Sequence, residues 1–170
     1  MFTGKTVGEI REMARKDAAD VLEVHWNGEY PVDPIVIARK LGASVFMSEL
    51  GDDVYGMLRK TDMEADIYID RDQSTNRQRF TCAHEVGHLV SHRDESGDFV
   101  DARSDEGRGT ASEIYANEFA AELLMPAPEL RRKLENSDSA YGRVLAELLL
   151  ADYFDVSLAA LQYRRKLLGV

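Results

Sequence analysis

A chain of 170 residues is long enough to bury one substantial hydrophobic core, so a single domain is expected. With 44% hydrophobic and 31% charged residues it has the composition of a soluble globular protein, and no apolar run approaches the roughly 18 residues of a membrane span. A formal net charge of −10 repels phosphate backbones and argues against nucleic acid as a direct ligand. The single cysteine excludes an internal disulfide, and no signal-peptide pattern opens the chain, so a cytoplasmic protein is expected.

Two helices are predicted at the start of the chain. Residues 6–22 begin with a T-x-x-E capping box, and their apolar residues recur on one helical stripe. A second, shorter helix is predicted over residues 35–41, because Asp33 and Pro34 are a typical N-cap and first helical residue. Gly42 is expected to end this helix.

The periodicity then changes to the alternation that is typical of strands, in the segments 43–50, 54–60 and 65–70. The last two are separated by the polar residues TDME and are predicted to form a hairpin, whose exposed edge could hold an extended substrate segment by strand addition. Together with the helices on either side, these segments predict a mainly helical α+β fold. The expected sheet is small and antiparallel, with about three strands.

A third helix is predicted over residues 76–92, with Thr75 and Gln78 as a second capping box at its start. Its apolar residues occupy one sector, beside a second sector that carries histidine and glutamate, as expected for a buried helix that lines a cleft. Gly87 lies in the middle of this helix, where glycine costs about 1 kcal/mol relative to alanine. Another backbone is therefore expected to approach closely at that position.

This helix contains the pattern H-E-x-x-H, with His84 and His88 four residues apart. Residues at this spacing lie on one helix face, one turn apart, so both imidazoles can bind the same metal ion. Glu85 lies on the same side and can act on a water without being a ligand, which is the arrangement of a metalloprotease. His92, one turn beyond His88, could support the transition state, although a histidine at such a position more often has a purely structural role.

The third metal ligand is expected from a helix predicted over residues 111–125. Of its three glutamates, Glu113 projects into the edge of the inward-facing sector, whereas Glu118 and Glu122 project towards the opposite side. Asn117, one turn beyond Glu113, is expected to orient a ligand imidazole from the second coordination sphere.

Two alternatives to this ligand remain open. Thr110 and Glu113 also form a T-x-x-E capping box, in which Glu113 would only cap its helix. Asp94, six residues beyond His88, could be the ligand of a metzincin-type site, although that pattern expects glycine where this chain has Ser91.

The rest of the chain is predicted to be an acidic surface loop, mobile and rich in glycine, over residues 93–109 and, after Pro126, a helical C-terminal part. Residues 1–126 would then carry the sheet and the metal-site helices of one domain, with residues 127–170 packed on them. Residues 151–169 also have a helix-turn-helix shape with three basic residues in the last helix, but the turn lacks glycine and the net charge is negative. Packing onto the core is the favoured interpretation.

Three segments resemble the ImmA/IrrE family of bacterial and phage metallopeptidases: RQRFTCAHEVGHLVSH, SEIYANEFAAELLMP and YFDVSLAALQYRRKLLG. The resemblance covers roughly residues 30–170. It implies that His84, His88 and Glu113 bind zinc and that Glu85 is the general base. Members of the family are typically encoded beside a helix-turn-helix repressor that they cleave, in stress responses, prophages or mobile elements, and some relatives belong to toxin–antitoxin modules.

The sequence therefore predicts a zinc-dependent endopeptidase that cleaves one cytoplasmic protein, a helix-turn-helix repressor or an antitoxin. The alternative is a partner-binding or DNA-associated regulator that retains the zinc site without using it for catalysis.

Overall fold

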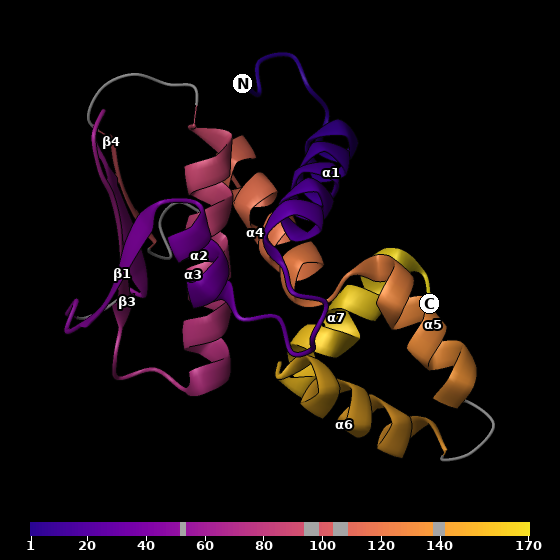
Figure 1. Cartoon of the computed structure of the whole chain (residues 1–170). Coiled ribbons are helices and arrows are strands. Elements are labelled where there is room, and N and C mark those ends of the chain that lie inside the picture. The colour runs from indigo at the N-terminus through magenta and orange to yellow at the C-terminus, as the bar shows by residue number, and fades with distance from the viewer. Residues whose placement is uncertain (52–53, 94–98, 104–108, 138–141) are drawn as a thin grey trace.

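The computed structural model describes residues 1–51, 54–93, 99–103, 109–137 and 142–170. It confirms the mainly helical α+β class, with one sheet on one side of a group of helices (Figure 1). Within the described ranges, no helix is long and apolar enough to cross a membrane. The elements, in chain order, are α1 (Val7–His25), α2 (Pro34–Lys40), β1 (Ala43–Ser48), β2 (Gly56–Lys60), β3 (Ala65–Asp70), α3 (Thr75–Ser91), β4 (Phe99–Arg103), α4 (Ala111–Leu124), α5 (Ala127–Ser137), α6 (Arg143–Phe154) and α7 (Leu158–Leu168).

The first two helices begin as their sequence signals predict. Thr6 caps α1 in a reciprocal box, in which its hydroxyl accepts from the Glu9 backbone and the Glu9 carboxylate accepts from the Thr6 backbone. The Asp33 carboxylate caps α2 by accepting from two backbone N–H groups of the first turn. These caps satisfy donors that have no partner inside the helix, which fixes where each helix starts.

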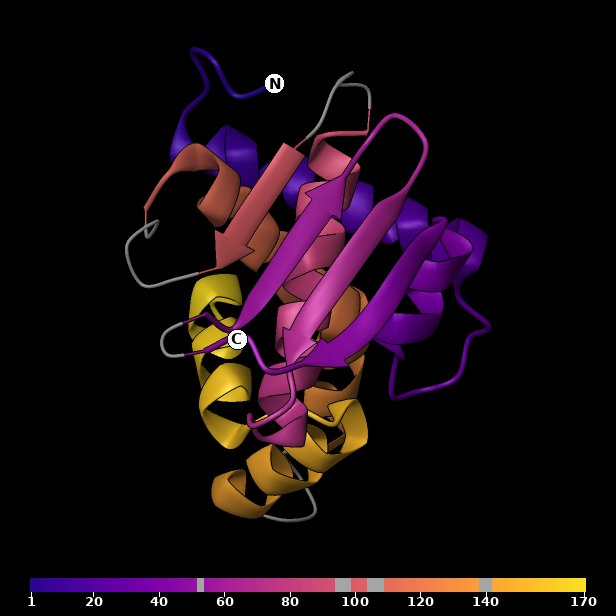
Figure 2. The same cartoon turned by 90° about the vertical axis from the view of Figure 1, so that its left-hand side faces the viewer.

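The sheet differs from the prediction in two respects. It has four strands in the order β1-β3-β2-β4, and it is mixed rather than antiparallel, because β1 pairs with β3 in parallel. The predicted hairpin of β2 and β3 is confirmed. Neither of its strands is an edge, because β3 lies between β1 and β2, and β2 lies between β3 and β4. Figure 2 shows this sheet face-on, with α3 behind it.

The additional strand, β4, comes from the segment that was predicted to be a loop. It pairs antiparallel with β2, from Gly56 opposite Arg103 to Lys60 opposite Phe99. The prediction is therefore wrong for residues 99–103, whereas 94–98 and 104–108 lie outside the described residues. β4 forms by pairing with a strand about forty residues away, and a segment of five residues carries little periodicity of its own.

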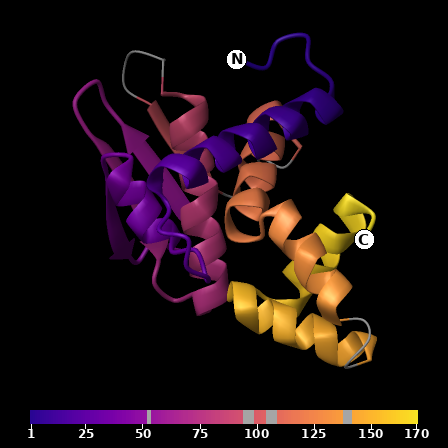
Figure 3. The same ribbon diagram turned by 45° about the vertical axis from the view of Figure 1, so that its right-hand side comes forward.

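α3 packs between the sheet and α4, while α1 lies across α4 from the other side (Figure 3). The expected close approach at Gly87 is confirmed, because a Cβ there would lie 3.0 Å from the Cα of Ala116 and 3.3 Å from the Cβ of Phe119. Both α4 residues are fully buried. The absence of a side chain on Gly87 thus brings α3 and α4 into backbone contact.

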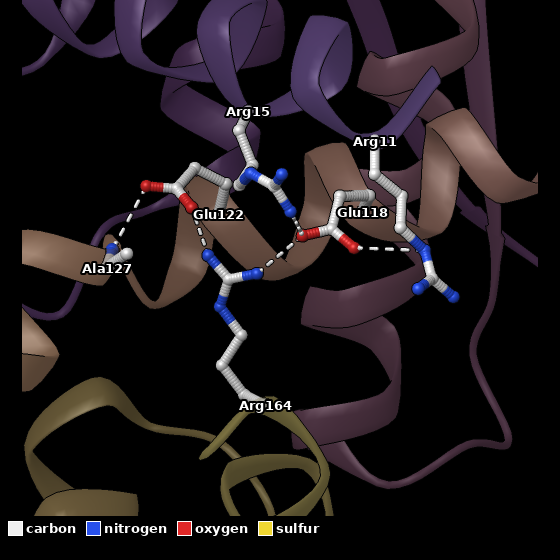
Figure 4. Close-up of polar contacts among 6 residues, drawn as sticks. All are labelled: Arg11, Arg15, Glu118, Glu122, Ala127 and Arg164. Atoms are coloured by element: carbon white, nitrogen blue, oxygen red, sulfur yellow. Dashed lines mark hydrogen bonds and ion pairs between the residues drawn. The ribbon is translucent and has the colours of Figure 1, made fainter. Parts of the chain in front are cut away.

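The C-terminal helices are attached to α4 through a buried polar cluster. Arg164 of α7 is 1% exposed, and it donates to Glu118 Oε1 at 2.7 Å and to Glu122 (Figure 4). Both glutamates are buried, although the sequence places them opposite the inward-facing sector of the helix, because α1 and α7 cover that side. Arg15 of α1 also donates to Glu118 Oε1, at 3.0 Å, so that one carboxylate of α4 joins α1 and α7.

A second contact of this cluster involves the start of α5. The Glu122 Oε1 atom accepts a hydrogen bond from the backbone N–H of Ala127 at 3.0 Å. It thereby satisfies one of the donors left free in the first turn of that helix. Glu118 and Glu122 of α4 thus contact both α7 and the start of α5.

Candidate metal centre

The central helix α3 supplies two of the candidate ligands. Its start differs from the prediction: Ser74, not Thr75, is the N-cap residue, and Thr75 is already helical. Gln78 therefore does not complete a capping box, and its side-chain amide donates to Arg71 O at 2.9 Å. From Thr81 to Ser91 every residue of α3 is buried, which confirms the prediction of a buried helix.

Three ligating atoms converge between α3 and α4. The Nε2 atoms of His84 and His88 are 3.0 Å apart, and Glu113 Oε1 lies 3.1 Å from His88 Nε2 and 3.4 Å from His84 Nε2. The two histidines are fully buried, while the Glu113 side chain is 14% exposed. Two ligands at 2.0–2.1 Å from a tetrahedral metal ion are separated by about 3.3 Å, so the three atoms are spaced as a metal site requires.

The other nitrogen of each imidazole is held by a side chain of α4. His84 Nδ1 lies 3.2 Å from Asn117 Oδ1, as predicted for Asn117, and His88 Nδ1 lies 3.1 Å from Ser112 Oγ. Because an amide oxygen can only accept, His84 carries its proton on Nδ1 and leaves the Nε2 lone pair directed at the shared point. Ser112 was not predicted from the sequence, although this residue directly precedes Glu113 on the same helix.

The position of the Glu113 side chain distinguishes a metal ligand from a helix cap, which the sequence left open. Thr110 Oγ1 accepts from the Glu113 backbone N–H at 3.3 Å, so Thr110 does cap α4. The Glu113 carboxylate, however, lies beside the two imidazoles rather than at the N-cap backbone. Burial on its own would raise the pKa of this carboxyl, but hydrogen bonds and electrostatic interactions with His84 and His88 outweigh it and hold the pKa well below its usual range. The other alternative, Asp94, lies outside the described residues.

Glu85 is fully buried beside the metal-binding face of α3. The first residue of β2, Gly56, passes so close to it that a Cβ on Gly56 would lie 2.9 Å from Glu85 Oε1 and would overlap the methyl group of Thr81. Strand β2 thus contacts the carboxylate that the sequence analysis assigned as the general base. Gly56 was not predicted to be part of the site, although a glycine in a strand often marks a position where another group comes close to the backbone.

His92 occupies a different place from the ligating histidines. It is the C-cap residue of α3, where its backbone N–H donates to His88 O at 3.0 Å. Its ring is not part of the group of converging atoms, which among the described residues consists of His84, His88 and Glu113. A role for His92 in catalysis therefore has no support from this geometry beyond its proximity along the helix.

Comparisons with known proteins show similarity to metallopeptidases. The sequence model of one peptidase family, the IrrE N-terminal-like domain, matches residues 38–166. The chain is also 39% identical over 84 residues to the radiation response metalloprotease IrrE of Deinococcus radiodurans. That stretch covers 48% of this chain and 25% of the relative, so the chain corresponds to only part of the longer protein.

Proposed function

The chain belongs to the IrrE N-terminal-like domain family of metallopeptidases, and on this premise we propose that it is a zinc-dependent endopeptidase with a specific protein substrate. The observation that carries the proposal is the convergence of two imidazole nitrogens and one carboxylate oxygen on a single point. This donor set is that of catalytic zinc sites, whereas magnesium and calcium prefer sites built from oxygen alone. His84, His88 and Glu113 would hold the ion.

The roles of the neighbouring residues follow from their contacts. Bound zinc would polarise the scissile carbonyl and lower the pKa of a water molecule. Asn117 fixes the tautomer of His84, and Ser112 holds the His88 ring through a hydroxyl that can accept the Nδ1 proton. Glu85 would accept the proton of the attacking water and return it to the leaving amine, the role of a carboxylate that acts as general base and acid.

The substrate segment is proposed to lie extended along β4, which replaces the hairpin as the edge of the sheet next to the site. Arg103 of β4 pairs with Gly56, and Gly56 lies against the Glu85 carboxylate. Within the described part of the chain, β4 has no strand on its other side, so its backbone groups can pair with an added strand. An extended segment bound there would run past the metal ligands.

As the substrate we propose a helix-turn-helix repressor, on the strength of the family resemblance. The alternative, a DNA-associated regulator, loses support from the C-terminal helices. Of the three consecutive basic residues in α7, Arg164 is buried against two glutamates and Arg165 pairs with Glu147. Only Lys166 is exposed, and one lysine does not make a DNA-binding surface.

Co-expression with the helix-turn-helix protein encoded beside this gene tests the proposal. The native protein should produce two defined repressor fragments, which mass spectrometry would assign to one cleaved bond. The Glu85→Gln variant keeps the shape of the side chain but removes the base, and it should bind zinc yet produce no fragments. If both forms relieve repression equally while the repressor stays intact, the protein acts by binding and is not a peptidase.

A further inference from the structure

A cavity of about 700 Å³ lies between α3, α4 and α7. This is within the range of small-molecule and peptide-binding sites in proteins. The side chains that line it are mainly apolar and include Phe80, Ile114, Ala121, Met125, Val156 and Ala160. The volume exceeds that of any single side chain, so that the nature of the walls, rather than size, determines what can bind.

The buried charged side chains that line this cavity already pair with each other, while Arg11 and Arg77, which also line it, are not buried. Glu118 and Arg164 both line it, and they form the buried ion pair of Figure 4. Arg15 adds a second hydrogen bond to the same Glu118 oxygen. A charged group that entered the cavity would have to compete with these short, buried contacts and would lose its hydration. The cavity therefore favours an apolar group.

Asn117 connects the cavity to the metal centre. It lines the cavity and is exposed, while its Oδ1 atom is 3.2 Å from His84 Nδ1. Because metal binding through His84 Nε2 keeps the proton on Nδ1, Asn117 must direct its oxygen at His84. Its Nδ2 group, which has no acceptor among the described residues, is then the one donor that this side chain can offer to a molecule in the cavity.

We propose that the cavity receives the bulky apolar side chain of the substrate residue next to the scissile bond, and that Asn117 Nδ2 donates to a backbone carbonyl of the same segment. The inference rests on the proposed peptidase function. Asn117 both lines the cavity and contacts His84, so a segment whose scissile bond lies at the metal centre can place a neighbouring side chain in the cavity. Asn117 would then have two tasks, one toward a metal ligand and one toward the substrate.

The apolar part of the proposal is tested with zinc-loaded protein and two hydroxamates, which bind zinc and differ only in bulk: acetohydroxamate and a form that carries an isobutyl group beside the hydroxamate. Calorimetry should give at least a tenfold higher affinity for the isobutyl compound, as expected when a side chain of this size is buried. Ala121→Phe, which fills the cavity one turn beyond Asn117, should abolish this preference while acetohydroxamate still binds. Ala19→Phe, on an exposed face of α1, is the control and should keep the preference.

Equal affinities of the native protein for the two compounds, or an undiminished preference in Ala121→Phe, would overturn the proposal and leave the peptidase function untouched. If acetohydroxamate itself does not bind to the zinc-loaded native protein, the metal chemistry is wrong and this inference falls with it.

The second task of Asn117 is tested by Asn117→Asp. Aspartate retains an oxygen for His84 but has no N–H group, and both hydroxamates are measured on the variant under saturating zinc, so that any change in metal affinity affects them alike. The affinity for an isobutyl hydroxamate extended by one amide bond, relative to that for acetohydroxamate, should fall by roughly three- to tenfold, the effect of losing one hydrogen bond. An unchanged relative affinity for the extended compound would show that Asn117 acts on His84 alone.

Discussion

Gly56 and Glu85 face each other across the contact between β2 and α3, and each restricts what the other can be. The carboxylate of Glu85 is fully buried, so its position is set by the atoms packed around it. Gly56 leaves the space that this carboxylate occupies, since a Cβ would lie only 2.9 Å from its Oε1 atom. Protein interiors are packed too densely to absorb an added methyl group without a shift.

Gly56→Ala is therefore expected to destabilise the protein by about 1–3 kcal/mol and to displace Glu85. Urea denaturation of the metal-free protein would measure the first effect, and cleavage of the repressor by the zinc-loaded variant the second. Gly8→Ala is the control, since Gly8 lies exposed in the first turn of α1, where a Cβ would make only an ordinary contact, 3.9 Å from Thr6 Oγ1. If Gly56→Ala matches Gly8→Ala in both measurements, the close contact is not tight.

The single thiol of the chain reports on the opening of α3. Cys82 is fully buried, and this burial raises the pKa of its thiol far above the ordinary range. At pH 8 the thiol should stay protonated and inaccessible, so a chromogenic disulfide reagent should react only after the protein unfolds. A rapid stoichiometric reaction of the folded protein would show that α3 is exposed in solution.

At the level of single residues, the sequence predicted the parts of the site that follow from helix periodicity. His84, Glu85, His88 and Glu113 could be assigned because i, i+4 spacing and an apolar sector determine which way a helical side chain points. Ser112 and Gly56 act through contacts between elements, whose distances only the folded chain defines.

Helix α4 makes two sets of polar contacts with different partners. One set joins Glu113 and Asn117 to the histidines of α3, and the other joins Glu118 and Glu122 to Arg164 of α7. The helix is thus fixed from both sides, which limits how far Glu113 can move from the point where the ligands meet. The starts of α1, α2 and α4 were predictable from their capping residues. The parallel pairing of β1 with β3 and the existence of β4 were not, because they depend on partners far along the chain.

Arg164→Leu removes the cation that two buried carboxylates share. Breaking a buried ion pair from one side is expected to cost about 3–5 kcal/mol of unfolding free energy, because uncompensated charge is left in the interior. Chemical denaturation of the metal-free variant measures this cost. The neighbouring Lys166→Leu, at an exposed position of the same helix, should change the unfolding free energy by less than about 0.5 kcal/mol. Similar values for the two variants would mean that Arg164 does not hold α7 on α4.

Over the whole molecule, the metal site and the Arg164 cluster connect the two halves of the chain. The site joins α3 to α4, and the cluster joins α4 to α1 and α7. We therefore propose that residues 1–126 and 127–170 unfold together as one cooperative unit. The family match, from residue 38 to 166, includes residues of both parts.

Removal of the metal should weaken this unit as a whole. Zinc that binds only the folded state stabilises it by about 4 kcal/mol at a concentration one thousand times its dissociation constant. A chelator should thus lower the melting temperature of the native protein in a single transition. The His84→Ala variant, which lacks a ligand, should melt near the temperature of the chelated protein and should not respond to the chelator. Two separate transitions would show instead that the two halves unfold independently.

The most direct test of the proposed site is the zinc content of the purified protein, measured by elemental analysis after dialysis against metal-free buffer. The native protein should carry one zinc per chain. Glu113→Ala should lose most of it, and Glu64→Ala, an exposed acidic position outside the site, should lose none. Full zinc content in Glu113→Ala, together with its loss in Asp94→Ala, would contradict the assignment of His84, His88 and Glu113 as the metal ligands.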